Sequence, residues 1–83
     1  SGYYSLFVDT VPDDVKRLYT ESAANDFAAL AQTAHRLKGV FAMLNLVPGK
    51  QLCETLEHLI REKDASGIEN YISDIDAYVK SLL

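Results

Sequence analysis

The spacing of the apolar residues constrains the fold of this chain more than any other feature. They recur every three or four positions along most of the 83 residues, which is the period of an amphipathic α-helix. No segment shows a convincing alternation at the period of two that a half-buried strand requires. Because only short breaks separate the helical segments, consecutive helices should pack as antiparallel neighbours. The sequence therefore predicts an all-α protein, an antiparallel up-down four-helix bundle with a short N-terminal lid helix.

The first helices are predicted from an apolar run and a helix-start signal near the N-terminus. Residues 3–9 are interpreted as the lid helix, which would cover one end of the bundle. The first bundle helix should begin near Thr10, which can cap it, with Pro12 in its first turn. Asn25 lies in the break that follows and is a candidate cap for a second bundle helix over about 26–44.

The remaining helix ends carry similar local signals. Asn45 tolerates the left-handed conformation that often ends a helix, and Val47-Pro48-Gly49 opens the third bundle helix. Either Asp64 or Ser66 can cap the last helix, and Glu69 would complete a capping box with Ser66. The predicted buried faces consist of the residues at helical spacing, which are Val11, Val15, Leu18, Tyr19, Phe27, Leu30, Ala34, Leu37, Phe41, Leu44, Leu52, Cys53, Leu56, Leu59, Ile60, Ile68, Tyr71, Ile72, Ile75, Val79 and Leu82.

Length and charge narrow the class of protein further. We expect a single domain over residues 1–83, with Ser1 and Gly2 a remnant of expression cloning. The chain has neither about 18 uninterrupted apolar residues nor a signal-peptide pattern, so we expect no membrane contact by this fragment. The net charge of −4, with acids and bases mixed, argues against nucleic-acid binding. The lone Cys53 cannot form an internal disulfide, which is compatible with a reducing compartment.

One helix face carries the residues with the clearest chemical meaning. His35 is followed by Lys38 three positions later and by Gly39 four positions later, so the three share one side of the helix. Glycine in a helix interior costs roughly 1 kcal/mol relative to alanine, and a purely structural helix would not favour it. With Gln32 and Ala42 beside it, His35 should stand on a low rim that another protein can approach closely.

This arrangement suits phosphoryl transfer. An exposed imidazole is largely neutral at pH 7 and has a free lone pair, so it is a good nucleophile. Phosphoryl transfer needs in-line positioning and charge stabilisation, and Lys38 could supply positive charge beside the transferred group. On periodicity alone, however, an ordinary half-exposed helix residue is an equally good interpretation of His35.

Two runs of the sequence resemble a known family. Ala34-His35-Arg36-Leu37-Lys38-Gly39 and Leu52-Cys53-Glu54-Thr55-Leu56-Glu57 are similar to the motifs of histidine-containing phosphotransfer (HPt) domains, which are four-helix bundles. Val40 and Phe41 depart from the small residues that many members have after the glycine. Asn45 stands where many members end the helix with glycine, and it can serve the same backbone role. The resemblance covers nearly the whole chain.

The resemblance implies a phosphocarrier and not an enzyme with kinase activity of its own. His35 would accept a phosphoryl group from the aspartate of one receiver domain and pass it to another, and Lys38 would stabilise the phosphate. Arg36, Lys38 and Lys50 would form a basic rim that steers the acidic pocket of a receiver. No cofactor or metal ion is expected in this chain, because Mg²⁺ would come from the receiver. The expected partner contacts are Gln32, Arg36, Gly39 and Ala42.

Further expectations concern partners and location. The run from Val40 to Gly49 resembles one member of the family in particular, which implies the receivers of a hybrid sensor kinase and of a response regulator as partners. It also implies the cytoplasmic C-terminal domain of an inner-membrane-anchored protein, and we expect a monomer. A rival interpretation is a structural bundle that binds partner helices through Val40, Met43 or the N-terminal aromatics. His58 lacks the small rim and the lysine–glycine pair, and is interpreted as a surface residue.

Overall fold

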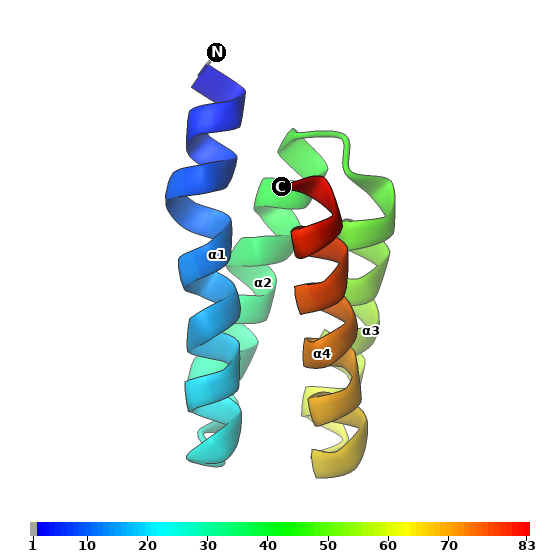
Figure 1. Cartoon of the computed structure of the whole chain (residues 1–83). Helices are drawn as coiled ribbons and strands as arrows, with labels where there is room; N and C mark the ends of the chain where they lie inside the picture. The colour runs from blue at the N-terminus through cyan, green and yellow to red at the C-terminus, as the bar shows by residue number, and fades with distance from the viewer. Residues whose placement is uncertain (1) are drawn as a thin grey trace.

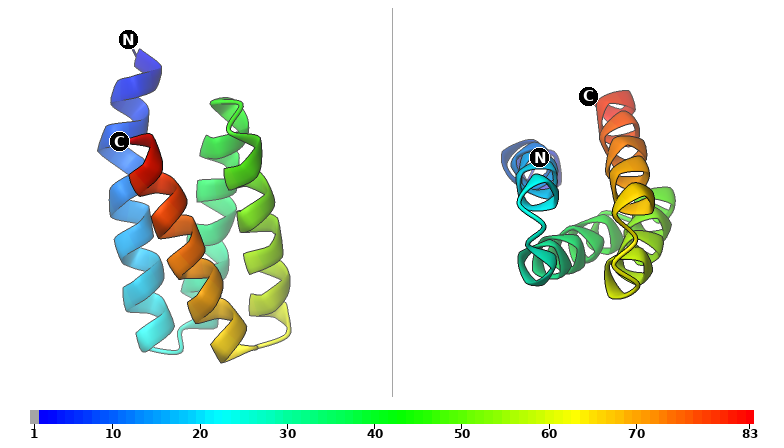
Figure 2. Two further views of the ribbon diagram at one scale, coloured as in Figure 1. Left: turned by 45° about the vertical axis from the view of Figure 1, so that its right-hand side comes forward. Right: turned by 90° about the horizontal axis from the view of Figure 1, so that it is seen from below.

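Four α-helices run antiparallel along one axis in the computed structural model, which describes residues 2–83 (Figure 1). They are α1 (Gly2–Ala23), α2 (Phe27–Met43), α3 (Val47–Arg61) and α4 (Ala65–Leu82), and the described residues contain no strand. Each helix packs against the next one in the sequence, and α4 packs back against α1 (Figure 2). The prediction of an all-α, antiparallel up-down bundle is therefore confirmed. Ser1 lies outside the described residues, so its interpretation as a cloning remnant stays a prediction.

The three turns share one backbone device. Each connection is three residues long, and its middle residue has a left-handed conformation: Asn25 (φ 53°), Asn45 (φ 57°) and Lys63 (φ 53°). Asparagine adopts this conformation more readily than most residues, because its short polar side chain can bond locally. The role predicted for Asn45 is thereby confirmed. The device reverses the chain within a few residues, so consecutive helices lie side by side.

The structure corrects the predicted cap of α2 and decides between the two caps predicted for α4. Asp26, and not Asn25, caps α2 by accepting a hydrogen bond from the Ala29 amide at 3.1 Å. Asn25 cannot take that role because it already adopts the left-handed turn conformation. Of the two candidate caps for α4, Asp64 is the one used, since its side chain accepts from the Gly67 amide at 3.0 Å. Ser66 lies inside the helix, so the capping box does not form.

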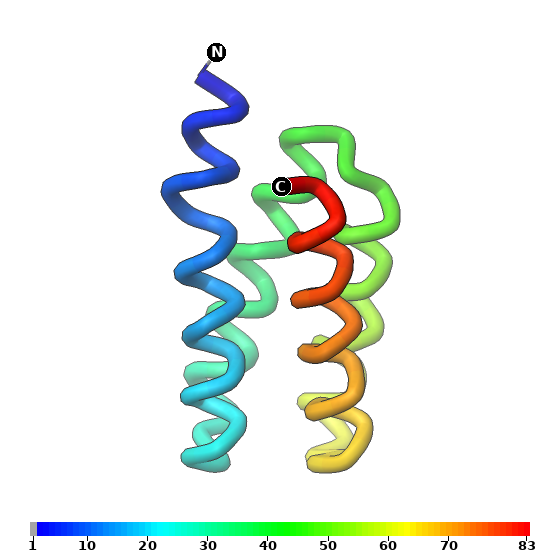
Figure 3. Tube along the Cα trace, in the orientation of Figure 1, coloured from blue at the N-terminus to red at the C-terminus, as the bar shows by residue number. Residues whose placement is uncertain are grey.

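The N-terminal lid helix does not exist as a separate element. Residues 3–9 and the predicted first bundle helix form the single helix α1, and its first turns project past the ends of the other helices (Figure 3). Thr10 is an interior residue whose hydroxyl donates to the Leu6 carbonyl, and Pro12 also lies inside the helix. A proline there removes one hydrogen bond from the helical ladder. The buried stripe that starts at Phe7 runs through Val11 without a break, so tertiary packing overrides the local start signal.

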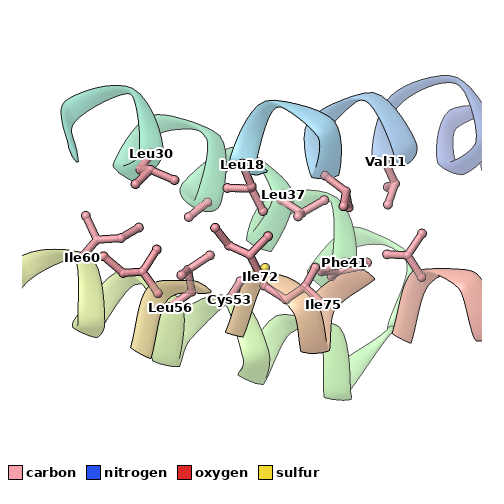
Figure 4. Close-up of a cluster of buried hydrophobic side chains, with 14 of the residues drawn as sticks. Val11, Leu18, Leu30, Leu37, Phe41, Cys53, Leu56, Ile60, Ile72 and Ile75 are labelled. Atoms are coloured by element: carbon pink, nitrogen blue, oxygen red, sulfur yellow. The ribbon is translucent and has the colours of Figure 1, made fainter. Parts of the chain in front are cut away.

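The core fills the centre of the bundle along its whole length (Figure 4). All four helices contribute side chains, and Cys53 is fully buried among them, as its position on the apolar stripe predicted. Burial of this apolar area is the main favourable term for a domain of this size. The buried hydrophobic residues are Phe7, Val11, Val15, Leu18, Leu30, Ala34, Leu37, Phe41, Cys53, Leu56, Ile60, Ile68, Ile72, Ile75 and Val79.

Four residues at the margins of the core needed the structure for their assignment. Tyr19 and Leu82 were predicted to be buried. Both predictions are wrong, because 43% of the surface of Tyr19 and 40% of that of Leu82 is exposed. The Tyr19 hydroxyl instead donates to Asp76 Oδ2 at 2.9 Å, which keeps the polar end of the ring in water. Val40 packs against the edge of the core, whereas Met43 is exposed.

A glycine at the start of α3 sets how closely that helix approaches α2. Gly49 is buried, and a Cβ atom added there would lie 2.8 Å from ring atoms of Phe41. Real side chains do not tolerate such a distance, so only glycine fits against the ring without a shift. The close packing at Gly49 therefore helps to fix the position of α3 beside α2 along the rest of the two helices.

Candidate functional site

The exposed face of α2 presents His35 near the middle of the helix. The neighbouring Ala34 and the following Leu37 are fully buried and fix the orientation of the helix, while 73% of the His35 side chain is exposed. Ala31 and Gly39, one turn away on either side, are exposed and small, and Ala31 belongs to this rim although the sequence analysis did not single it out. The imidazole therefore stands clear of its surroundings, where a second protein can reach it.

A single carboxylate on α3 contacts both His35 and Lys38. Glu57 Oε1 lies 2.8 Å from Lys38 Nζ, and Glu57 Oε2 lies 3.4 Å from His35 Nδ1. Glu57 was quoted in the sequence only as part of a resembling run and received no role there. One sequence signal could have identified it: Glu57 is four positions after the buried Cys53, so an acid sits at the edge of an apolar stripe.

The ion pair with Glu57 changes the electrostatics of the site. The contact between the Lys38 ammonium and the Glu57 carboxylate raises the pKa of Lys38. Burial lowers this pKa but offsets the rise only in part, and the charges of Glu57 and Glu54 raise it further. Lys38 therefore remains a cation at every pH at which the domain would work. Its side chain is only 26% exposed, so the ammonium lies against α3 and does not extend into solvent.

The structure gives Arg36 a partner inside the domain. Its guanidinium donates to both carboxylate oxygens of Asp14 on α1, from Nη2 at 3.0 Å and from Nε at 3.3 Å. Arg17 contacts the same carboxylate at 2.9 Å, and Asp14 is almost completely buried. These hydrogen bonds raise the pKa of Arg36 and tie α2 to α1. The partner contact predicted for Arg36 is not tested, but the structure shows a residue that already links two helices.

The other predicted contact residues lie on the surface around His35. Gln32, Gly39 and Ala42 are all exposed on α2, and a Cβ atom added at Gly39 would meet nothing within 4 Å. Gly39 is therefore not a packing glycine, in contrast to Gly49. The open space beside it is what a close approach by a partner requires, and the structure brings these three residues to the same face as His35.

Other candidate chemistry is not supported in the part of the chain that the structure describes. Residues 2–83 contain no group of three or more His, Cys, Asp or Glu side chains that could hold a metal ion. Burial raises the pKa of the Cys53 thiol to about 12, so it is not a thiolate nucleophile. His58 is exposed with Glu62 at 3.9 Å, and Arg61 and Glu62 stand where the lysine–glycine pair follows His35. Across residues 2–83, none of the helices has the length and apolar character needed to cross a membrane.

Comparison with known proteins assigns the class to which this fold and site belong. The sequence model of the Hpt domain matches residues 2–83, and the chain belongs to this family. It is 90% identical over its 83 residues to phosphotransferase RcsD of Escherichia coli K12, and it spans only 9% of the length of that protein. The solution structure of the Escherichia coli YojN histidine-phosphotransferase (HPt) domain is similar, with a TM-score of 0.96 and 90% identity over the whole chain and 72% of that structure. The chain is thus a histidine-phosphotransfer module.

Proposed function

We propose that this domain carries a phosphoryl group between receiver domains, with His35 as the phosphoacceptor. The observation that carries the proposal is an imidazole exposed on a rim of small residues, with the Lys38 ammonium beside it on the neighbouring turn. An exposed nucleophile suits transfer between proteins, because the donor must bring its own reacting group to the ring. Membership of the Hpt family supports this use of the site.

The chemistry asked of this chain is limited. In the transfer a bond forms between a ring nitrogen of His35 and phosphorus, and the bond between phosphorus and the donor aspartate oxygen breaks. The electron pair of the broken bond stays on the aspartate carboxylate. Positioning of the reactants and stabilisation of charge provide most of the catalysis in such a step. The Lys38 ammonium beside His35 would provide part of the charge stabilisation. We therefore propose a carrier without kinase activity of its own, with Mg²⁺ supplied by the receiver.

We further propose the receivers of a hybrid sensor kinase and of a response regulator as donor and acceptor. The likeness to RcsD supports this assignment, and on the same ground we propose a cytoplasmic location at the end of a membrane-anchored protein. Lys50 is exposed and remains available for steering an acidic receiver pocket, whereas the charge of Arg36 is partly neutralised by Asp14 and that of Lys38 by Glu57. A panel of phosphorylated receivers assayed with this domain would rank the partners.

The test of the phosphoacceptor is transfer from a phosphorylated receiver, compared between the wild type, His35→Gln and His58→Gln. We expect label that is stable in base and lost in acid on the wild type and on His58→Gln, and none on His35→Gln. Label that survives acid and is lost in base would show a different linkage. Unchanged relay activity in His35→Gln would favour the rival function, an interaction bundle that carries no phosphoryl group.

A further inference from the structure

Arg36, the residue that follows His35, is held on the side of α2 that faces α1. The helix α2 packs against both α1 and α3, and the two cations nearest His35 in the sequence contact opposite neighbours (Figure 2). The ammonium of Lys38 lies against α3, whereas the guanidinium of Arg36 lies against Asp14 of α1. Both positive charges are therefore held at the flanks of α2, and the exposed imidazole stands between them.

Asp14 holds the Arg36 guanidinium by two hydrogen bonds and from a buried position. Arg36 Nη2 donates to one carboxylate oxygen at 3.0 Å and Nε donates to the other at 3.3 Å, which fixes the plane of the guanidinium. Asp14 is only 3% exposed, and Arg17 Nη1 donates to the same carboxylate at 2.9 Å. Electrostatic attraction is less screened where water is excluded. Arg36 is therefore fixed more firmly than a free surface arginine, whose long side chain samples many rotamers.

A buried carboxylate is a costly way to join two helices. Taking a charge out of water carries a penalty, and well-packed apolar residues often hold helices together equally well. Stability alone therefore does not explain why Asp14 and Arg36 are paired. The place of Arg36 in the sequence indicates another reason, because a free arginine next to a phosphoacceptor could bend back over it. A guanidinium binds phosphate oxygens by two parallel hydrogen bonds, a geometry that an ammonium cannot match.

We propose that Asp14 is a positioning residue that keeps Arg36 away from the phosphoryl group on His35, an inference that rests on the proposed function of His35. A carrier must release the group that it accepts. In onward transfer the bond between phosphorus and the ring nitrogen breaks, its electron pair returns to the imidazole, and phosphorus bonds to an oxygen of the acceptor aspartate. An arginine already bound to the phosphoryl oxygens would compete for them with the Mg²⁺ of the receiver. It would stabilise the phosphohistidine more than the transition state, and release would become slower.

The lifetime of the phosphohistidine tests this role without any receiver. The donor would be phosphoramidate, which transfers its phosphoryl group to histidine and releases ammonia. Asp14→Asn keeps the shape of the side chain and removes the charge that holds Arg36, so we expect its phosphohistidine to hydrolyse roughly three- to tenfold more slowly. The double variant Asp14→Asn/Arg36→Gln should return to the wild-type lifetime, which a merely structural effect of Asp14→Asn would not do. Arg17→Gln is the control, because it leaves Asp14 free to hold Arg36, and its lifetime should be unchanged.

Onward transfer gives the second readout. The acceptor would be the receiver that takes the phosphoryl group fastest in the panel described above. At saturating receiver, we expect Asp14→Asn to slow transfer by a factor similar to the change in lifetime, and the double variant to recover the wild-type rate. Because Arg36 is also a predicted contact of the receiver, the receiver concentration that gives half of the maximal rate reports docking. The saturating rate is the quantity that reports the role of Asp14.

A measurement on the wild type keeps the test decisive if thermal denaturation shows that Asp14→Asn does not fold. The ¹H–¹⁵N resonance of Arg36 Nε–H reports the hydrogen bond to Asp14, and it should keep its position when His35 is phosphorylated. A shift toward the resonance of Arg61, which is exposed and serves as an internal reference, would show that Arg36 leaves Asp14 and would overturn the proposal.

Two results with the variants would also overturn the role of Asp14. One is a wild-type or shorter lifetime of the phosphohistidine in Asp14→Asn, and the other is a longer lifetime that the double variant retains. Absence of label on wild-type His35, from phosphoramidate and from every receiver, would instead defeat the proposed function.

Discussion

Lys38 is the residue at which an effect on chemistry can be separated from an effect on the fold. Its ammonium pairs with Glu57 at a partly exposed position, and such pairs contribute little to stability. We therefore expect Lys38→Ala to leave the melting temperature nearly unchanged and to slow phosphotransfer roughly three- to tenfold. Lys16→Ala, which removes the same charge from an exposed position on α1, is the control. A large fall in melting temperature with normal transfer would show that Lys38 is structural.

Gly39 separates docking from stability at the same surface. Because Gly39 is exposed and a Cβ atom added there meets nothing within 4 Å, Gly39→Leu should not reduce the stability of the bundle. It should nevertheless weaken the complex with a receiver and slow transfer, since the new side chain stands beside His35. The control is Ala77→Leu on the exposed face of α4, which should bind normally. Unchanged receiver affinity in Gly39→Leu, measured by titration calorimetry, would contradict the close-approach role.

At the scale of the helices, two glycines that both lie inside helices should respond in opposite ways to the same substitution. Gly39→Ala should raise the free energy of unfolding by roughly 0.5–1 kcal/mol, because alanine is the better helix former and the space is open. Gly49→Ala should lower it by about 1–3 kcal/mol, because the new methyl group would collide with the Phe41 ring. Urea denaturation of both variants measures the difference. Equal effects would mean that the contact between α2 and α3 relaxes without cost.

The turns show how helix ends and helix pairing depend on each other. Asn25 and Asn45 mark two of the reversals by their tolerance of a left-handed backbone, and Asp26 caps the helix that follows the first reversal. Lys63 occupies the same position in the third turn, although lysine adopts the left-handed conformation less readily than asparagine. We infer that the packing of α3 against α4 keeps the Lys63 backbone in this conformation. The same reasoning explains α1, where the continuous apolar stripe outweighs Pro12.

For the whole molecule, the buried thiol predicts a loss of stability in alkaline solution. Burial raises the pKa of Cys53 from 9.0 to about 12, so the folded chain keeps a proton that the unfolded chain loses. The folded state binds more protons between these two values, and stability must therefore fall as the pH rises through this window. The slope cannot exceed about 1.4 kcal/mol per pH unit for one group. Below pH 9 the contribution is fully present.

The measurement is urea denaturation of the wild type and of Cys53→Ala at pH 8, 9 and 10. The variant should be less stable at pH 8, because it leaves a small cavity, but its stability should fall less between pH 8 and pH 10. The pKa values of Lys38 and Tyr19 are also raised and act in the same direction, at higher pH. Parallel curves for the two proteins would show that the thiol does not contribute.

The sequence by itself determined the features that arise from local periodicity and backbone preference. Helical spacing predicted all-α architecture and most of the buried stripe, and Asn45 predicted the end of α2. The motif containing His35 and Lys38 predicted the face on which the site lies. These inferences succeed because residues one turn apart on a helix are neighbours in any fold that keeps the helix.

Only the tertiary structure decided which residues from other helices complete the site. Glu57 reaches His35, and Asp14 reaches Arg36, each across 22 positions of the chain. No pattern within a single helix fixes such a pair, because it depends on the rotation and approach of two helices, which Gly49 and the core side chains set. For the same reason the sequence placed a break before Thr10, where packing of Phe7 and Val11 makes α1 continuous. The local sequence pattern identified His35 as the candidate nucleophile, and the packing of the four helices determined which side chains contact it.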